Sequence, residues 1–380
     1  MKKLTFLLFG LFLFGLTLFS YAFVDPNLIY LKKLYTGFAF TNREITTGIY
    51  FLSVLIFFVF YGIFLYQAHK KILNILDTKL LVGLTLGVLL FSYPAVLSYD
   101  IFNYTTTAKI LFTYHENPYI VMPIEFIGDP FLLFTHATNK LALYGPFWII
   151  INGIPHFFGF GNFLLTLFNF KLLISMFYIG TSIFVWKITK SVFSTILFAL
   201  NPLIIIETLI GAHNDIVMMF LTLLSFFLLM KKKIIFAVLF LSASILIKYA
   251  TVFLIPVFVI AAFKIIKKQK VDWEKVYIFS FLSMIVIFLL SLFREEIYPW
   301  YAIWFLTFVP LIPNKKIILY VSLAFSFGLL LRHIPFMLLG THFGITPLIK
   351  SFVTFVPALL VFLFKLRENL AACREDEAKQ

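Results

Sequence analysis

The chain has 380 residues, of which 62% are apolar and only 13% are charged. No soluble domain of this size keeps so apolar a composition in solution, so these proportions exclude a soluble globular protein. The formal net charge of +14 does not indicate a nucleic-acid partner, because the basic residues stand in short clusters between apolar runs, as membrane anchors do.

Long apolar runs recur along the whole chain, and they do not alternate with polar residues as the strands of a membrane barrel would. Backbone groups inside a bilayer must be paired within their own segment, so these runs are predicted to be transmembrane helices. The single cysteine, Cys373, excludes an intrachain disulfide and a thiolate cluster for a metal ion. The predicted fold class is therefore an all-α, polytopic transmembrane helical bundle.

The first predicted element is the apolar run that follows Lys2 and Lys3, which lacks a convincing cleavage site of small residues. We interpret it as a transmembrane helix whose N-terminus is cytoplasmic. The later basic clusters are His69–Lys71, Lys187 with Lys190, Lys231–Lys233, Lys264–Lys270, Lys315 with Lys316, and Lys365 with Arg367. Because basic residues are enriched in cytoplasmic loops, placing all of these clusters inside predicts about twelve spans and two cytoplasmic termini.

The longest stretch between predicted spans, residues 99–143, lies outside in this topology. The next stretch, 144–159, is apolar enough to cross, but a crossing there would put Lys187 outside. Its Pro146 and Pro155 predict instead a broken segment, that is, a re-entrant or interfacial helix. The predicted organisation is a transmembrane domain over 1–366, with its outer loop at 99–143, and a charged cytoplasmic tail over 367–380.

The outer loop begins with a carboxylate, Asp100, directly after an apolar helix. An ionisable side chain at the membrane boundary costs free energy unless it is paired, hydrated or functional. At the rim of a cavity, such a carboxylate can accept a proton from an attacking hydroxyl group, as a general base does. The structural alternative is that Asp100 caps the next helix, because Asp is a preferred residue at helix N-termini.

A second polar group, Glu207 with Gly211–Asp215, falls on the same predicted side of the membrane. His213, Asn214 and Asp215 supply an acid–base group, an amide and a carboxylate within one turn, which suits the hydroxyl groups of a sugar. A divalent cation is an alternative ligand, although neighbours in sequence rarely supply a whole coordination shell. A polar hairpin in which Asn214 or Asp215 caps a helix would explain the same residues.

Two cations, Lys248 and Arg332, stand apart from the cytoplasmic clusters. Each adjoins a long apolar run, and such cations favour an anionic partner such as a lipid phosphate. Snorkelling to lipid headgroups is the alternative, and it explains Lys248 less well because this residue interrupts its hydrophobic stretch. Trp300, in the aromatic segment Tyr298–Tyr301, either anchors the chain at the membrane interface or stacks on a sugar ring.

These motifs follow one another in a recognisable order. They are Ser98–Tyr104, Asn117–Tyr119, Asp129 with Pro130, Tyr144–Pro146 with Trp148, Asn201 with Pro202, Glu207, Ala212–Asp215, Lys248 and Tyr298–Tyr301. The series resembles the GT-C class of integral-membrane glycosyltransferases, and specifically the prokaryotic mannosyltransferases that use polyprenyl phosphate mannose. The resemblance covers most of the chain from Tyr93 to Tyr301, and the order of the short motifs makes it specific.

The resemblance implies a GT-C fold with a large first outer loop, and a lipid-linked sugar donor in place of a nucleotide sugar. Asp100 matches the family's loop aspartate, the expected general base, and Lys248 matches a basic position suited to the donor phosphate. Many GT-C enzymes carry two adjacent carboxylates in this loop, whereas an apolar residue follows Asp100 here. Its partner carboxylate, whether Asp129, Glu116 or Asp215, is therefore left open. The residues expected to bind substrate are Tyr99, Asn103, Tyr104, Asp129, Tyr144, Glu207, His213, Asn214, Asp215, Lys248, Trp300 and Arg332.

The predicted function is transfer of a hexose, with mannose as first candidate, from a polyprenyl phosphate to a glycan or lipid-linked acceptor. The reaction is expected at the extracytoplasmic face of the cell membrane, with membrane lipids and no nucleic acid as further partners. The cofactor is undefined, since the residues fit either none or a divalent cation. A multi-span transporter or lipid flippase is the alternative class, but it should spread its polar residues toward the bilayer midplane and show an inverted repeat.

Overall fold

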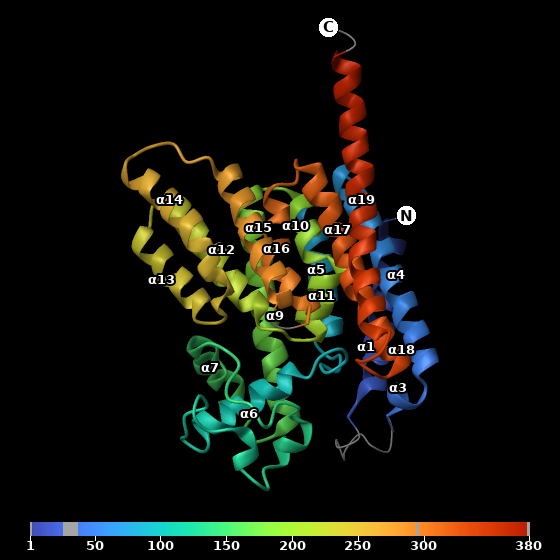
Figure 1. Ribbon diagram of the computed structural model, residues 1–380, viewed down its shortest axis with the longest axis vertical. Coiled ribbons are helices and arrows are strands. Elements are labelled where there is room, and N and C mark those ends of the chain that lie inside the picture. Colours follow the sequence, from blue (N-terminus) through green and yellow to red (C-terminus); the bar gives the residue numbers. More distant parts are fainter. Residues whose placement is uncertain (1, 26–36, 294–295, 378–380) are drawn as a thin grey trace.

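The computed structural model describes the backbone of residues 2–25, 37–293 and 296–377, and the side chains of these residues up to Asn369. Every regular element in these ranges is helical (Figure 1). The long helices are α1 (Lys2–Ser20), α4 (Arg43–His69), α5 (Ile75–Leu89), α9 (Phe163–Thr189), α12 (Asp215–Met230), α15 (Trp273–Leu290), α17 (Lys316–Leu331) and α19 (Thr346–Glu377). The shorter ones are α3 (Phe38–Thr41), α6 (Asp100–Phe112), α7 (Pro146–Ile151), α8 (Gly153–Phe157), α10 (Val192–Ala199), α11 (Pro202–Ile205), α13 (Ile234–Ile245), α14 (Ile255–Ile266), α16 (Ile303–Leu306) and α18 (Ile334–Leu339).

Within the described residues, seven helical segments are long and apolar enough to cross a membrane. An eighth span results if α10 and the helical segment Pro202–Ile210, bent by 50° relative to each other, are counted as one. The prediction of an all-α, polytopic membrane bundle is thus confirmed. The number of about twelve spans, which came from the distribution of basic residues, stays a prediction.

Residues of several basic clusters lie at one end of the bundle. At one end Lys315 pairs with Glu274 at 2.7 Å, and Lys2 pairs with Asp77. An open groove at this end is lined by side chains from α4, α10 and α17 and by Lys71, which follows α4. Helices α6 and α7 lie at the opposite end, at the bottom of the view (Figure 1). These basic clusters and the long polar stretch therefore occupy opposite ends of the molecule.

The predicted outer loop, residues 99–143, contains α6 and two short 3₁₀ helices, Pro123–Glu125 and Pro130–Phe134. Helices α7 and α8 follow, and with six and five residues they meet at Asn152. Neither reaches the length of about 20 residues that a crossing requires. The stretch 144–159 is thus broken into short helices, while its placement at the membrane surface stays a prediction.

The last helix, α19, is 32 residues long and extends well beyond the rest of the bundle at the end with the basic clusters (Figure 1). The predicted tail, 367–380, begins inside this helix, which continues to Glu377. Its cytoplasmic position and its status as a separate unit stay predictions.

Phenylalanine side chains hold α1 against α4. The ring of Phe9 lies 6.1 Å from Phe57, 5.4 Å from Phe60 and 5.1 Å from Phe64, measured between ring centroids. Lipid tails are as apolar as these side chains, so helices in a bilayer associate through close packing rather than through escape from water. Tilted and edge-to-face ring pairs at these separations add a favourable electrostatic contribution.

A buried lysine fixes the segment that leads to Asp100. From α9, the Lys171 ammonium donates hydrogen bonds to the carbonyl oxygens of Leu89 (2.8 Å) and Ser92 (2.5 Å) and to Ser92 Oγ (2.7 Å). The last carbonyl groups of a helix lack donors within the helix, and a cation there is electrostatically favoured. All three ammonium donors are thus used at the end of α5, where the chain turns toward α6.

Candidate active site

Asp100 is the first residue of α6, and its side chain is partly buried. Tyr99 is the N-cap residue and its side chain makes no capping hydrogen bond, while the backbone N–H of Asp100 donates to Ser98 Oγ at 3.2 Å. The Asp100 carboxylate therefore does not play the capping role of the structural alternative. Burial raises the pKa of the Asp100 carboxyl group, the positive charges of His213 and Lys248 counteract part of this effect, and Asp215 adds to it. The pKa is raised overall, which makes the ionised carboxylate a better proton acceptor.

The structure distinguishes between the three carboxylates that the sequence offered as partners of Asp100. Asp215 interacts electrostatically with Asp100. Asp129 forms an ion pair of 2.6 Å with Lys109 within the outer segment, and Glu116 is exposed to solvent. Asp215 is therefore the carboxylate whose charge acts on Asp100.

The segment that carries the second polar group has an unusual backbone. Ile206–Ile210 form a π-helical turn, and Ala212 has a left-handed conformation with φ of 53°. Such conformations cost free energy and concentrate at functional sites. The turn folds His213 back, so that its Nδ1 lies 2.9 Å from the carbonyl oxygen and 3.2 Å from a carboxylate oxygen of Glu207. Both side chains are fully buried.

The His213 ring is fixed in place but retains an unused polar atom. It stacks on Trp300 with 4.1 Å between ring centroids and 12° between planes. Nδ1 faces two Glu207 oxygens and therefore donates, whereas Nε2 is buried and has no hydrogen-bond partner. Both amide atoms of Asn214 are also buried without a partner. Because buried polar atoms are nearly always paired with protein or water, these three atoms mark a place for water or for hydroxyl groups of a ligand.

Asp215 is held by two residues from distant parts of the chain. The Lys248 ammonium lies 2.9 and 2.8 Å from its two carboxylate oxygens, and the indole N–H of Trp304 donates to Oδ1 at 2.6 Å. The Lys248 ammonium also lies 5.0 Å from the centroid of the Tyr301 ring. Lys248 is thus paired with a carboxylate, and a phosphate group at this point would compete with Asp215.

Gly145 brings the end of the outer segment against the turn after α13. Its amide donates to the carbonyl oxygen of Ile247 at 3.0 Å. A Cβ atom at position 145 would lie 2.1 Å from the carbonyl oxygen of Leu246, a separation that no side chain tolerates. The close approach holds Tyr144 beside the carboxylate of Asp100, with which it interacts.

Helix α6 contributes further predicted residues. The backbone N–H of Asn214 donates to the Tyr104 hydroxyl group at 3.3 Å, and the Tyr104 ring lies 4.8 Å from that of Tyr144. Asn103, one residue earlier, has a buried Oδ1 without a partner. The structure thus groups most of the predicted residues around one place: Asp100, Tyr104, Tyr144, Glu207, His213, Asn214, Asp215, Lys248 and Trp300.

The other predicted residues have different surroundings. Asp129 belongs to the ion pair in the outer segment, and Tyr99 stacks on His136 with 3.8 Å between centroids. Arg332 pairs with Glu296 at 3.1 Å and donates to a backbone carbonyl group. These contacts neither confirm nor contradict a role in substrate binding.

Two neighbours of the site were not expected from the sequence. Trp304 contacts Asp215, and His333 Nε2 lies 3.6 Å from Glu207, an ion-pair distance beyond hydrogen-bond range. Both stand close in sequence to a predicted residue, but their positions show no distinctive spacing. In the described part of the chain, no three His, Cys, Asp or Glu side chains converge as a set of metal ligands.

The fold and the site define a polytopic helical membrane enzyme whose acid–base groups converge at one end of the bundle, as expected of a GT-C glycosyltransferase. The family model described as "Alpha-(1->6)-mannopyranosyltransferase, N-terminal domain" matches residues 41–264. The match covers more than half of the chain, which therefore belongs to this family of mannosyltransferases. No curated protein and no solved structure matches the chain significantly. The matched range contains Asp100, 207–215 and Lys248, and it ends before Trp300 and Arg332.

Proposed function

We propose that the chain transfers a mannosyl group from a polyprenyl phosphate donor to a hydroxyl group of a glycan or lipid-linked acceptor, on the extracytoplasmic side of the cell membrane. One observation carries the proposal: a partly buried carboxylate, Asp100, interacts electrostatically with His213, and His213 Nε2 and the adjacent Asn214 amide are buried polar atoms without hydrogen-bond partners. A base together with unpaired donors and acceptors suits the transfer of a sugar from a phosphate to an acceptor hydroxyl group.

The chemical step is a displacement at the anomeric carbon. The acceptor oxygen attacks this carbon while Asp100 takes the hydroxyl proton. The bond between the anomeric carbon and the phosphate oxygen breaks on the opposite face, and its electron pair leaves with the phosphate. This in-line geometry inverts the anomeric centre.

Lys248 is the predicted phosphate-binding cation whose charge acts on Asp100. Its ammonium group is paired with Asp215, so its positive charge offsets that carboxylate and lowers the negative potential around the reacting centre. Arg332, the alternative cation for the leaving phosphate, pairs with Glu296.

The sugar is proposed to lie against the buried polar atoms. Asn214 can both donate to and accept from sugar hydroxyl groups. His213 Nε2 donates when the ring carries the positive charge that acts on Asp100, and it accepts when only Nδ1 carries a proton. Their position at the end opposite the basic clusters supports an extracytoplasmic reaction, since basic loops are retained in the cytoplasm.

The test is a transfer assay on the full-length protein in nanodiscs. Radiolabelled polyprenyl phosphate mannose and, separately, a nucleotide-linked mannose are offered with a panel of lipid and oligosaccharide acceptors. We expect product from the lipid-linked donor only. Asp100→Asn should lower turnover by about 10²- to 10⁴-fold, the usual contribution of a general base, and leave donor binding largely intact.

Glu125→Gln makes the same chemical change at an exposed carboxylate of the outer segment and should keep full activity. Turnover retained in Asp100→Asn would remove the assignment of the base. Product from the nucleotide-linked donor would remove the assignment of the donor.

A further inference from the structure

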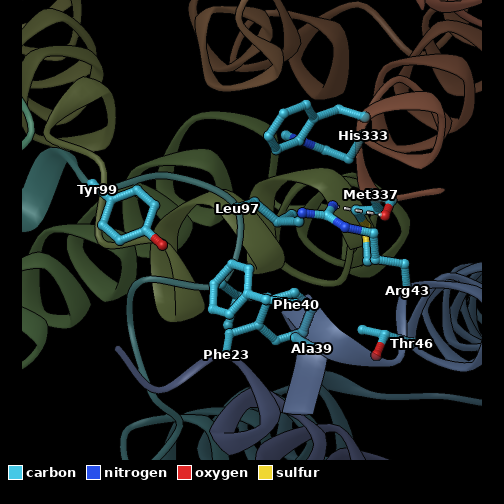
Figure 2. A pocket seen from close by; sticks show the side chains of 11 residues that line it. Phe23, Ala39, Phe40, Arg43, Thr46, Leu97, Tyr99, His333 and Met337 are labelled. Atoms are coloured by element: carbon cyan, nitrogen blue, oxygen red, sulfur yellow. Dashed lines mark hydrogen bonds between the residues drawn. The ribbon is translucent and has the colours of Figure 1, made fainter. Parts of the chain in front are cut away.

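A cleft of about 100 Å³ lies between α4, α18 and the segment 96–99 (Figure 2). Two residues of its lining adjoin the candidate active site. Tyr99 precedes Asp100 in the chain, and His333 lies 3.6 Å from Glu207. A molecule in the cleft would therefore lie beside the segment that carries the proposed base.

Most of the lining of this cleft is apolar. Its apolar residues are Phe23, Ala39, Phe40, Val96, Leu97, Phe336 and Met337. Phe40 is 40% exposed, and Ile45 and Ile49, close by at the start of α4, are also exposed. In a membrane protein such exposed side chains face lipid, so the cleft is accessible to a hydrocarbon chain from the bilayer.

One cation, Arg43, projects into this apolar setting (Figure 2). Its Nη1 donates to the carbonyl oxygen of Met337 at 3.2 Å, and within the described residues no carboxylate pairs with it. Gly340 allows the guanidinium group to approach, because a Cβ there would lie 2.8 Å from Arg43 Cζ. Arg43 is thus held by backbone and keeps its charge available, whereas Lys248 and Arg332 are each paired with a carboxylate.

Two further polar side chains line the cleft. Thr46 is 1% exposed, and its hydroxyl oxygen has no hydrogen-bond partner. His333 Nε2 is buried and makes no hydrogen bond, although the Glu207 carboxylate lies 3.6 Å away. Together with the guanidinium group these atoms offer a cation and hydrogen-bonding groups at one place, a combination that suits a phosphate group.

We infer that this cleft binds the phosphate group and the first isoprene units of the lipid donor, with Arg43 as the principal phosphate ligand and Thr46 and His333 as further ligands. The inference rests on the proposed function, since it locates the donor of that reaction. The apolar wall receives the isoprenoid chain, and the sugar points past Tyr99 toward Asp100. Such a placement also explains why Lys248 can stay paired with Asp215.

The experiment measures binding to the full-length protein in nanodiscs, with farnesyl phosphate as the probe and farnesol, inorganic phosphate and phosphatidylglycerol as comparisons. Arg43→Gln should weaken binding of farnesyl phosphate by about 10- to 100-fold, the value of a lost charge-assisted hydrogen bond, and Arg43→Lys should restore part of it. Arg367→Gln makes the same change at an exposed arginine in α19 that does not line the cleft, and it should have no effect.

A second variant tests the apolar wall of the cleft, and it keeps the inference testable if Arg43→Gln does not fold. Ala39→Leu fills the cleft and leaves every charge in place. It should weaken binding of farnesyl phosphate while binding of inorganic phosphate is unchanged. Unchanged binding of farnesyl phosphate in Arg43→Gln overturns the inference. So does displacement of the probe by phosphatidylglycerol at equal concentration, because the cleft would then be an ordinary lipid site.

Transfer assays on the same samples separate this inference from the proposed function. If the wild type transfers mannose from the lipid donor, Arg43→Gln should raise the donor KM much more than it lowers kcat. If no donor yields product but farnesyl phosphate still depends on Arg43 for binding, the proposed reaction fails and the phosphate site stands. If transfer occurs and both KM and binding ignore Arg43, only the site is wrong.

Discussion

The interface between α1 and α4 and the cluster around Asp215 are both buried, but they are built on opposite rules. Around Phe9 the helices are regular, the contacts are ring against ring, and every one of these side chains is apolar. Around Asp215 the buried side chains are charged or polar, several of their atoms lack partners, and the preceding backbone contains a π turn and a left-handed alanine.

The cluster around Asp215 contains features that lower the stability of the fold, whereas the Phe9 interface does not. Buried unpaired atoms and strained backbone are costly, and they persist only where the surrounding structure determines them. The Phe9 interface supplies stabilising packing, and it contains no group proposed to act in the reaction. Substitutions in the two regions should therefore separate stability from turnover.

The largest effect is expected for Lys248→Met, which leaves Asp215 with Trp304 as its remaining hydrogen-bond donor. Removal of one partner of a buried ion pair costs about 3–5 kcal/mol of folding free energy, and it removes the positive charge beside Asp100. Turnover should fall by at least about 100-fold, as for the loss of an electrostatic catalyst. Thermal unfolding and the transfer assay measure the two effects, with exposed Lys267→Met as control.

A loss of stability without a loss of turnover is expected for Phe57→Ala. The side chain is 1% exposed, and its removal leaves a cavity that costs about 3–5 kcal/mol. The kcat per folded molecule should match the wild type, because the ring contacts that the structure describes for Phe57 are with Phe9 and Phe12 of α1. Phe51→Ala on the lipid-exposed face of α4 serves as control. A reduced kcat in Phe57→Ala at a temperature where it is folded would mean that the two regions are coupled.

A matched pair of glycine substitutions tests the close approach at the site. Gly145→Ala forces its Cβ into the Leu246 carbonyl group, so it should cost about 1–3 kcal/mol and lower turnover by displacing Tyr144. Gly87→Ala in α5 meets no atom within 4 Å, and it should be neutral or stabilising by up to about 1 kcal/mol. Equal effects of the two changes on turnover would contradict the role assigned to position 145.

The smallest effect is a displacement of the pH profile. Burial raises the pKa of Asp100, and a base acts only when ionised, so kcat/KM should fall on acidification at a higher pH than an ordinary aspartate would give. The pH dependence of kcat/KM for the wild type measures this limb. Residual activity of Asp100→Asn should lack it, and an acid limb that persists unchanged in this variant would belong to another group.

Apolar runs in the sequence predicted the helices. The resemblance carried by the order of the short motifs predicted that Asp100, His213 and Lys248 come together, although these residues lie far apart along the chain. The pairing of Asp215 with Lys248 and Trp304 was not predictable, because it depends on how α12, α13 and α16 pack. The same holds for the partner of Asp100, which only the folded chain distinguishes.

The surroundings of Arg43 could not be predicted from the sequence pattern. In the sequence it is a single basic residue before an apolar run, like any membrane anchor. Its setting becomes visible only when α18 places Met337 and Gly340 against it. The number of spans is hard to count from sequence for a related reason, since α10 and the segment Pro202–Ile210, bent by 50° relative to each other, are long enough for a span only when taken together.

Lys171 has a consequence for biogenesis. A lysine inside a transmembrane helix costs up to about 2.5–3.5 kcal/mol during insertion at the translocon, and Lys171 lies in the first third of α9. The groups that solvate its charge are the carbonyls of Leu89, the last residue of α5, and of Ser92 just after it, and both are synthesised earlier. We therefore expect α9 to enter the bilayer against an already inserted α5, so that the order of synthesis becomes the order of assembly.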